Sequence, residues 1–146
     1  MPIGSPQWMY ASGEAFTIDQ SLRTNDDDSA YLSWTPASAG NQRTWTWSGW
    51  VKRGELGSNN TIFGAGNGGS IFDELRFGSD DKLDFYTYSS ATNGQRKSTA
   101  VFRDTSAWYH IVAVYDSTDS TALDRMKLYV NGEQVTALGT TNYPPE

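Results

Sequence analysis

The chain has 146 residues, no cysteine and a formal net charge of −6, with a pI of about 4.6. This length suits one domain with a substantial core, and the lack of cysteine excludes disulfides, thiolate metal sites and cysteine nucleophiles. The acidic balance disfavours binding to a phosphate backbone, and no apolar run approaches the roughly 18 residues of a membrane helix. We therefore expect neither a nucleic-acid partner nor a membrane partner.

The first fifteen residues differ in character from the rest of the chain. They lack the basic and apolar segments of a secretory signal. Trp8, Met9 and Tyr10 are nevertheless too apolar for a freely solvated tail. Residues 1–15 are expected to be an arm that makes an assembly contact, and residues 16–146 to form the folded domain.

Short alternating or apolar runs recur along the rest of the chain, separated by clusters of glycine, asparagine, aspartate and serine. No long stripe with the 3.6-residue period of a helix appears, so the runs are predicted to be strands. Many short strands at regular spacing favour an all-β, two-sheet antiparallel jelly-roll sandwich. The predicted strands are residues 16–22, 30–34, 44–52, 61–65, 71–77, 82–88, 99–102, 108–115 and 126–130.

The segment TWTWSGWVKR, which begins at Thr44, holds three of the six tryptophans. Side chains of a strand alternate between its two faces, so Trp45 and Trp47 share one face and Trp50 points to the other with Lys52. We expect Trp45 and Trp47 to be buried between the sheets. Trp50 then either fills a second layer of core or forms a platform for a ligand.

Three segments occur in a telling order: WTWSGWVKR, AWYHIVAVYD and MKLYVNGEQV. Together they resemble the concanavalin A-like lectin/glucanase jelly rolls of the laminin-G and pentraxin type, over residues 16–135. The stretch SLRTNDDDSAYLSWTPASAGN is similar to a version found in tail-fibre and structural proteins of marine bacteriophages. This resemblance implies a virion location, with other tail subunits or further copies of the chain as partners.

Domains of this type continue to a last strand that pairs near the first one. No such strand is present in this sequence, which ends at Pro144-Pro145-Glu146. The jelly roll is therefore expected to lack its closing strand, which a longer chain or another subunit would supply. An unpaired edge invites pairing with another chain, so the isolated chain is not expected to be a self-sufficient monomer.

Glucanases share this fold, so catalysis must be weighed. Their sites need two carboxylates close enough to act as acid and nucleophile. Asp73 and Glu74 are adjacent and face opposite sides of their strand, and the acidic neighbour in phase with Asp84 lies in a turn. The sequence therefore predicts no enzymatic activity, with a glycan hydrolase as the least favoured alternative.

His110, the only histidine, lies in a strand that is apolar on both faces. A catalytic histidine needs an orienting carboxylate and a nucleophile beside it. Relatives carry histidine here without catalysis, so a buried or half-buried structural residue is expected.

Two aspartate-rich turns suggest calcium, which takes oxygen ligands from such loops and is bound by many relatives. Asp26 and Asp28 are the favoured ligands in the first turn, and the second turn holds Asp116, Asp119 and Asp124. The alternative is a solvated turn, because aspartate also satisfies turn backbone unaided.

Four aromatic residues alternate with polar neighbours: Trp50, Tyr86, Tyr88 and Tyr129. On one sheet they would form a sugar-binding platform; the alternative is packing beneath a loop or against a subunit. The favoured function is a non-enzymatic virion structural or tail-fibre protein whose lectin-like domain serves attachment or assembly. A stand-alone carbohydrate-binding module is the runner-up.

Overall fold

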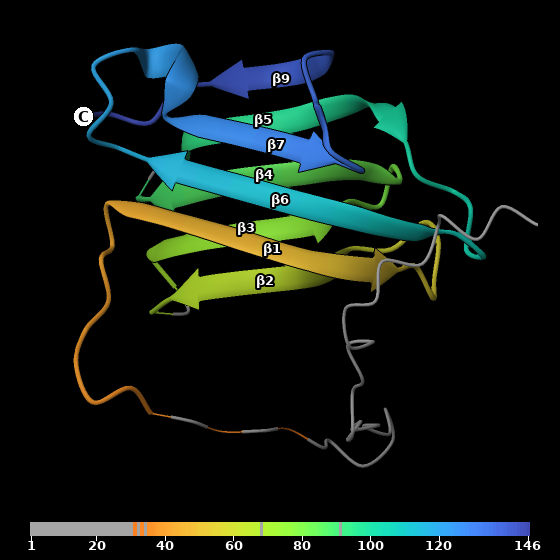
Figure 1. The fold of residues 1–146 in the computed structure, drawn as a ribbon, viewed down its shortest axis with the longest axis horizontal. Coiled ribbons are helices and arrows are strands. Elements are labelled where there is room, and N and C mark those ends of the chain that lie inside the picture. Colours follow the sequence, from red (N-terminus) through yellow and green to blue (C-terminus); the bar gives the residue numbers. More distant parts are fainter. Residues whose placement is uncertain (1–30, 32, 34, 68, 91) are drawn as a thin grey trace, which may run out of the picture. The chain divides into compact units, whose positions relative to one another are not determined.

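The computed structural model describes residues 31, 33, 35–67, 69–90 and 92–146. The chain divides into two units, residues 1–39 and 40–146, and the second unit holds two packed antiparallel sheets (Figure 1). The described strands are β1 (Thr44–Lys52), β2 (Asn60–Gly66), β3 (Ile71–Phe77), β4 (Lys82–Ser89), β5 (Thr92–Val101), β6 (Trp108–Asp116), β7 (Met126–Val130), β8 (Glu133–Gln134) and β9 (Leu138–Asn142).

The four-stranded sheet has the order β1-β6-β7-β8, and the five-stranded sheet has the order β2-β3-β4-β5-β9. The described part holds one 3₁₀ turn, Ala122–Asp124, and no helix that is long and apolar enough to cross a membrane. The predicted all-β sandwich is confirmed. The strands β1 and β2 are edge strands of their sheets, and Figure 1 shows them on the same side of the sandwich.

The predicted phase of β1 is confirmed. Trp45 lies between the sheets, with its ring centroid 5.5 Å from those of Phe63 and Phe85 on the five-stranded sheet. Trp47 also faces the core, but both indoles are half-buried rather than buried as the sequence predicts. Gly49 shares this inward face. A Cβ at this position would lie 2.8 Å from the ring of Trp47, so a larger residue would displace the indole.

The fully buried core is built from alternate residues of central strands. Because every second side chain of a strand points inward, each strand contributes pairs two positions apart. These residues are Leu75, Phe77, Leu83, Phe85, Ile111, Ala113, Met126 and Leu128.

Arg53 follows β1 directly and anchors its end. Its guanidinium is buried and lies 3.0 Å from the carboxylate of Asp81, a residue with a φ of 61°. Hydrogen bonds from Arg103 and the amide of Gly57, together with Arg53, lower the pKa of Asp81 to about 2. This ion pair fixes the position at which β1 leaves the sheet.

Several predicted strand limits were wrong. The strand expected at residues 99–102 begins earlier, at Thr92, and β8 and β9 were missed. Most residues of β5 are polar, and such a pattern is typical of a loop. This segment forms a strand because it pairs with neighbouring strands of the five-stranded sheet. Its Arg96 points inward, donating to the carbonyls of Met126 and Asn142.

The predicted strand at residues 30–34 also fails where it can be checked, since Tyr31 and Ser33 lie outside any strand. The expected arm and the expected strand at residues 16–22 lie outside the described residues.

Candidate functional site

The four predicted platform aromatics lie on two different sheets, which corrects the sequence-based expectation. Trp50 on β1 and Tyr129 on β7 face outward from the four-stranded sheet. Tyr86 and Tyr88 on β4 face outward from the five-stranded sheet, on the other side of the sandwich. The period of two predicts which side of its own sheet a residue occupies, but it carries no information about which sheet that is.

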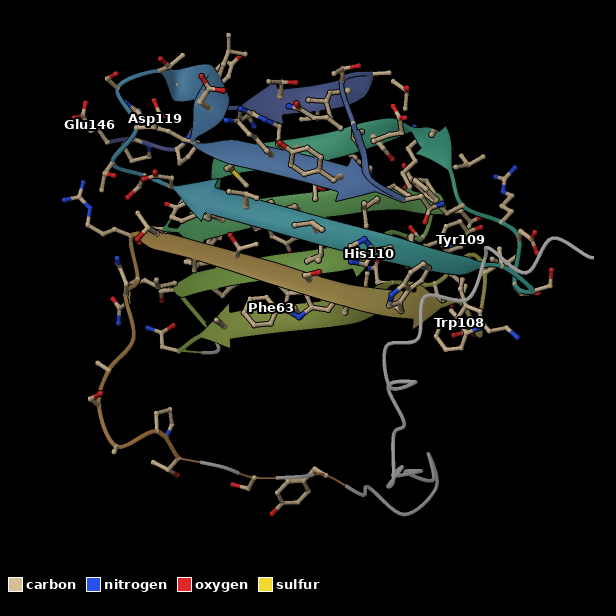
Figure 2. All side chains as sticks on the ribbon, viewed as in Figure 1. Phe63, Trp108, Tyr109, His110, Asp119 and Glu146 are labelled. Carbon is tan, nitrogen blue, oxygen red and sulfur yellow. The ribbon has the colours of Figure 1, made fainter. Side chains whose placement is uncertain are left out.

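The outer face of the four-stranded sheet presents two exposed indoles. Trp50 is 65% exposed, and Trp108 at the start of β6 is 59% exposed. In the β1–β6 ladder, Trp50 stands opposite His110, and Trp108 stands opposite Lys52, so the indoles are diagonal neighbours. Figure 2 shows Trp108 and His110 along β6. We call Trp50, Trp108 and His110 the indole platform.

His110 is half-buried, as expected, and holds the platform in place. Its imidazole Nε2 lies 3.0 Å from the hydroxyl of Ser48, and its ring centroid lies 5.1 Å from that of Trp50. Its backbone amide donates to the side chain of Asn131 at 2.9 Å. No carboxylate among these contacts orients the ring, so the described geometry contains no catalytic triad.

The outer face of the five-stranded sheet is a dense polar network. Glu74 on β3 accepts hydrogen bonds from the hydroxyls of Thr61 and Tyr86. Arg76 lies two residues further along β3 and donates to Glu74 at 3.4 Å and to Asp84 on β4 at 3.3 Å. Gln95 on β5 donates to the second oxygen of Asp84 at 2.8 Å. One arginine thus joins carboxylates from two strands, a cross-strand pair that the sequence analysis missed.

The aromatic residues of this face are engaged in the network. The guanidinium carbon of Arg76 lies 4.6 Å from the ring centroid of Tyr86. Phe72 packs edge-on against Tyr86 and stacks on Tyr88, with centroids 5.6 and 5.2 Å apart. These rings are half-buried and leave less free surface than the indole platform.

The electrostatics of Glu74 oppose a role as general acid. Burial acts to raise the pKa of Glu74, but hydrogen bonds from Thr61 and Tyr86 and the charge of Arg76 outweigh it and lower the pKa. Burial and the bond to Glu74 raise the pKa of Tyr86 to about 12. A glycosidase needs one carboxyl group that stays protonated, which requires a raised pKa.

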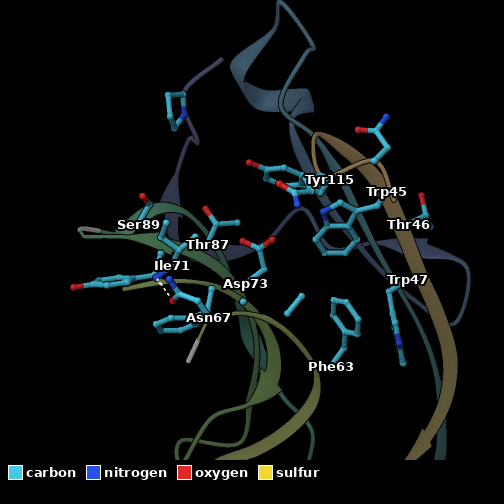
Figure 3. Close-up of a pocket in the computed structure, with 17 residues that line it drawn as sticks. Trp45, Thr46, Trp47, Phe63, Asn67, Ile71, Asp73, Thr87, Ser89 and Tyr115 are labelled. Atoms are coloured by element: carbon cyan, nitrogen blue, oxygen red, sulfur yellow. Dashed lines mark hydrogen bonds between the residues drawn. The ribbon is translucent and has the colours of Figure 1, made fainter. Parts of the chain in front are cut away.

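A cleft opens between the two sheets beside β1 and β2, with a volume of about 780 Å³. Its walls include the rings of Trp45, Phe63 and Tyr115, and Asp73 projects into it (Figure 3). Burial raises the pKa of Asp73. The pKa of Tyr115 is also raised, mainly by burial and to a smaller extent by the negative charge of Asp73. As predicted, Asp73 and Glu74 face opposite sides of β3.

The predicted calcium ligands Asp26 and Asp28 lie outside the described residues, so calcium binding stays a prediction. In the second aspartate-rich turn, Asp116 and Asp119 accept hydrogen bonds from neighbouring Thr118 and Thr121. Asp124 pairs with Lys127 at 2.9 Å. Within the described part of the chain, no three acidic, histidine or cysteine side chains are arranged to hold a metal ion.

Two antiparallel sheets that pack face to face define the class of β sandwiches. The family model of the laminin G type, described as the concanavalin A-like lectin/glucanases superfamily, matches residues 26–146. The chain belongs to this superfamily. No curated protein and no solved structure matches the sequence significantly.

Proposed function

We propose that the chain is a non-enzymatic, lectin-like attachment domain that binds glycans on the indole platform. The observation that carries this proposal is the exposure of Trp50 and Trp108 on adjacent strands. Large exposed aromatic patches on soluble domains mark interaction sites. An indole offers a flat apolar face with one polar N–H, which suits the apolar face of a pyranose ring.

Polar groups beside the platform supply the hydrogen bonds that a sugar requires. Ser48 and His110 lie beside Trp50, Asn131 accepts a hydrogen bond from the backbone amide of His110, and Lys52 stands opposite Trp108. These groups provide both donors and acceptors, so they match the hydroxyl groups of a glycan. The apolar stacking surface therefore lies beside groups that confer orientation and specificity.

Two features support a binding role without catalysis. Arg76 holds Glu74 and Asp84 together, and the lowered pKa of Glu74 keeps this carboxylate ionised. Neither carboxylate lies on the face that carries the indole platform. We expect no turnover on β-glucans or other polysaccharides, and turnover that is abolished by Glu74→Gln would contradict this expectation.

The attachment domain is proposed to belong to a virion structural protein such as a tail fibre. The support is the similarity of SLRTNDDDSAYLSWTPASAGN and WTWSGWVKR to segments of such proteins. A virion subunit should assemble, whereas the second candidate, a stand-alone carbohydrate-binding module, should be monomeric. Analytical ultracentrifugation of the 146-residue chain separates these two functions.

Glycan-array binding tests the platform directly. Trp50→Ala and Trp108→Ala should each abolish most of the binding. The matched control is Leu123→Ala, because Leu123 is equally exposed, at 64%, and lies in the 3₁₀ turn outside the platform. Binding that survives both tryptophan variants, or that Leu123→Ala weakens equally, would refute the proposal.

A further inference from the structure

The cleft between the sheets contains two polar side chains without a hydrogen-bond partner in the part of the chain that the structure describes. Asp73 on β3 and Thr87 on β4 stand opposite each other in the ladder, and both line the cleft. Among the described residues, no hydrogen bond or ion pair reaches the side chain of Asp73, and the buried hydroxyl oxygen of Thr87 has no hydrogen-bond partner. Buried polar groups in folded proteins are almost always paired, so the unpaired hydroxyl of Thr87 calls for an explanation, and the half-buried carboxylate of Asp73 beside it is open to the cleft.

The walls of the cleft include several aromatic rings beside polar residues such as Asn41 and Asn67. None of the described lining residues is positively charged, and the charges of Arg43 and Arg125 reach the wall residue Tyr115 from outside the lining. Trp45 stacks on Tyr115 with ring centroids 5.6 Å apart and packs against Phe63 at 5.5 Å. Asp73 is the only charged side chain among the described residues that line the cleft. Aromatic faces attract cations, and a partly desolvated carboxylate attracts them more strongly than an exposed one does.

We propose that this cleft binds an alkylammonium group, with its N–H donors bonded to Asp73 and Thr87 and its alkyl stem against Trp45 and Phe63. This site is separate from the indole platform and does not depend on the glycan proposal. A volume of about 780 Å³ lies within the usual range of small-molecule pockets. The ammonium group would be supplied by a free amine or by the lysine side chain of a bound peptide, since both present the same chemistry.

Isothermal titration calorimetry of the 146-residue chain with n-butylammonium tests the site. The neutral probe of matched length is 1-butanol. The charge-assisted bond to Asp73 should make the amine bind about tenfold more tightly than the alcohol. Asp73→Asn should remove this preference, and Thr87→Val should weaken amine binding by a smaller factor.

Asp80→Asn is the control variant, because Asp80 is an exposed aspartate that pairs with Lys82 and Lys97 away from the cleft. It should leave amine binding unchanged. Equal binding of amine and alcohol to the wild-type chain would overturn the proposal, as would an unchanged preference in Asp73→Asn. Absence of amine binding at millimolar concentration would overturn it as well.

A second titration uses lysine capped at both its amino and carboxyl ends. Tighter binding of capped lysine than of n-butylammonium would identify a peptide side chain as the source of the ammonium group. Tighter binding of the simple amine would identify a free amine. Failure of the glycan-array experiment would leave both results standing, because the indole platform lies on the outer face of β1 and β6.

Discussion

The two outer faces of the sandwich use similar side chains in different ways. On the five-stranded sheet, Tyr86 and Glu74 are joined with Arg76 in one hydrogen-bonded network. On the four-stranded sheet, Trp50 and Trp108 stay exposed. Both faces follow the same alternation of aromatic and polar residues along their strands.

The difference lies in whether charges of opposite sign meet across strands. In the five-stranded sheet, Arg76 stands directly opposite Asp84, and Glu74 stands opposite Tyr86. In the four-stranded sheet, Trp50 stands opposite His110, and Lys52 stands opposite Trp108. A face whose polar groups bind one another contributes to stability, whereas a face whose indoles stay exposed is free to bind a ligand.

The largest expected change in the free energy of unfolding concerns the inward face of β1. Trp45→Ala removes the indole that packs against rings of both sheets, so it should lower the free energy of unfolding by about 3–5 kcal/mol. Trp50→Ala on the opposite face of the same strand should change it by no more than about 0.5 kcal/mol. Urea denaturation measures the free energy of unfolding of both variants. Equal losses in the two variants would show that Trp50 is also part of the core.

Arg76→Met tests whether the polar face is structural. It leaves Asp84, which is 1% exposed, without its cationic partner, so unfolding should become about 3 kcal/mol easier. The matched control is Lys52→Met on the four-stranded face, which should cost no more than about 0.5 kcal/mol, because Lys52 is exposed. Urea denaturation again gives both values, and similar values for the two variants would remove the distinction between the faces.

The smallest expected effect is on the stability of the fold as the pH is lowered. Since its folded pKa is lowered, Glu74 stabilises the fold at pH values above its unfolded pKa, and this contribution is lost as the pH falls through the folded pKa. Glu74→Gln should therefore be less stable than the wild type near neutral pH, by about 1 kcal/mol. The gap should close on acidification; a gap that stays constant from about pH 7 to about pH 3 would show that ionisation of Glu74 is irrelevant.

Local patterns predict the inward and outward phases correctly. Counting in twos assigns Trp45, Trp47 and Trp50 to their faces, and the structure confirms all three assignments. The predicted limits of β3, β6 and β7 agree with the structure within one residue, because their apolar residues alternate or run without interruption. Trp108 was missed as a platform residue, although its position two residues before His110 places it in phase with the outer face.

The sequence by itself determined the class of fold, the strands with apolar patterns and the side of each strand that faces the core, because alternation is a property of consecutive residues. Only the tertiary structure decided which strands share a sheet, because pairing joins segments far apart in the chain, as Trp50 and His110 show. For this reason the predicted four-residue platform separated into two faces. Within the five-stranded sheet, the register of the β3–β4 hairpin placed Asp84 opposite Arg76, which also contacts Glu74 on its own strand, and placed Asp73 opposite Thr87 in the cleft.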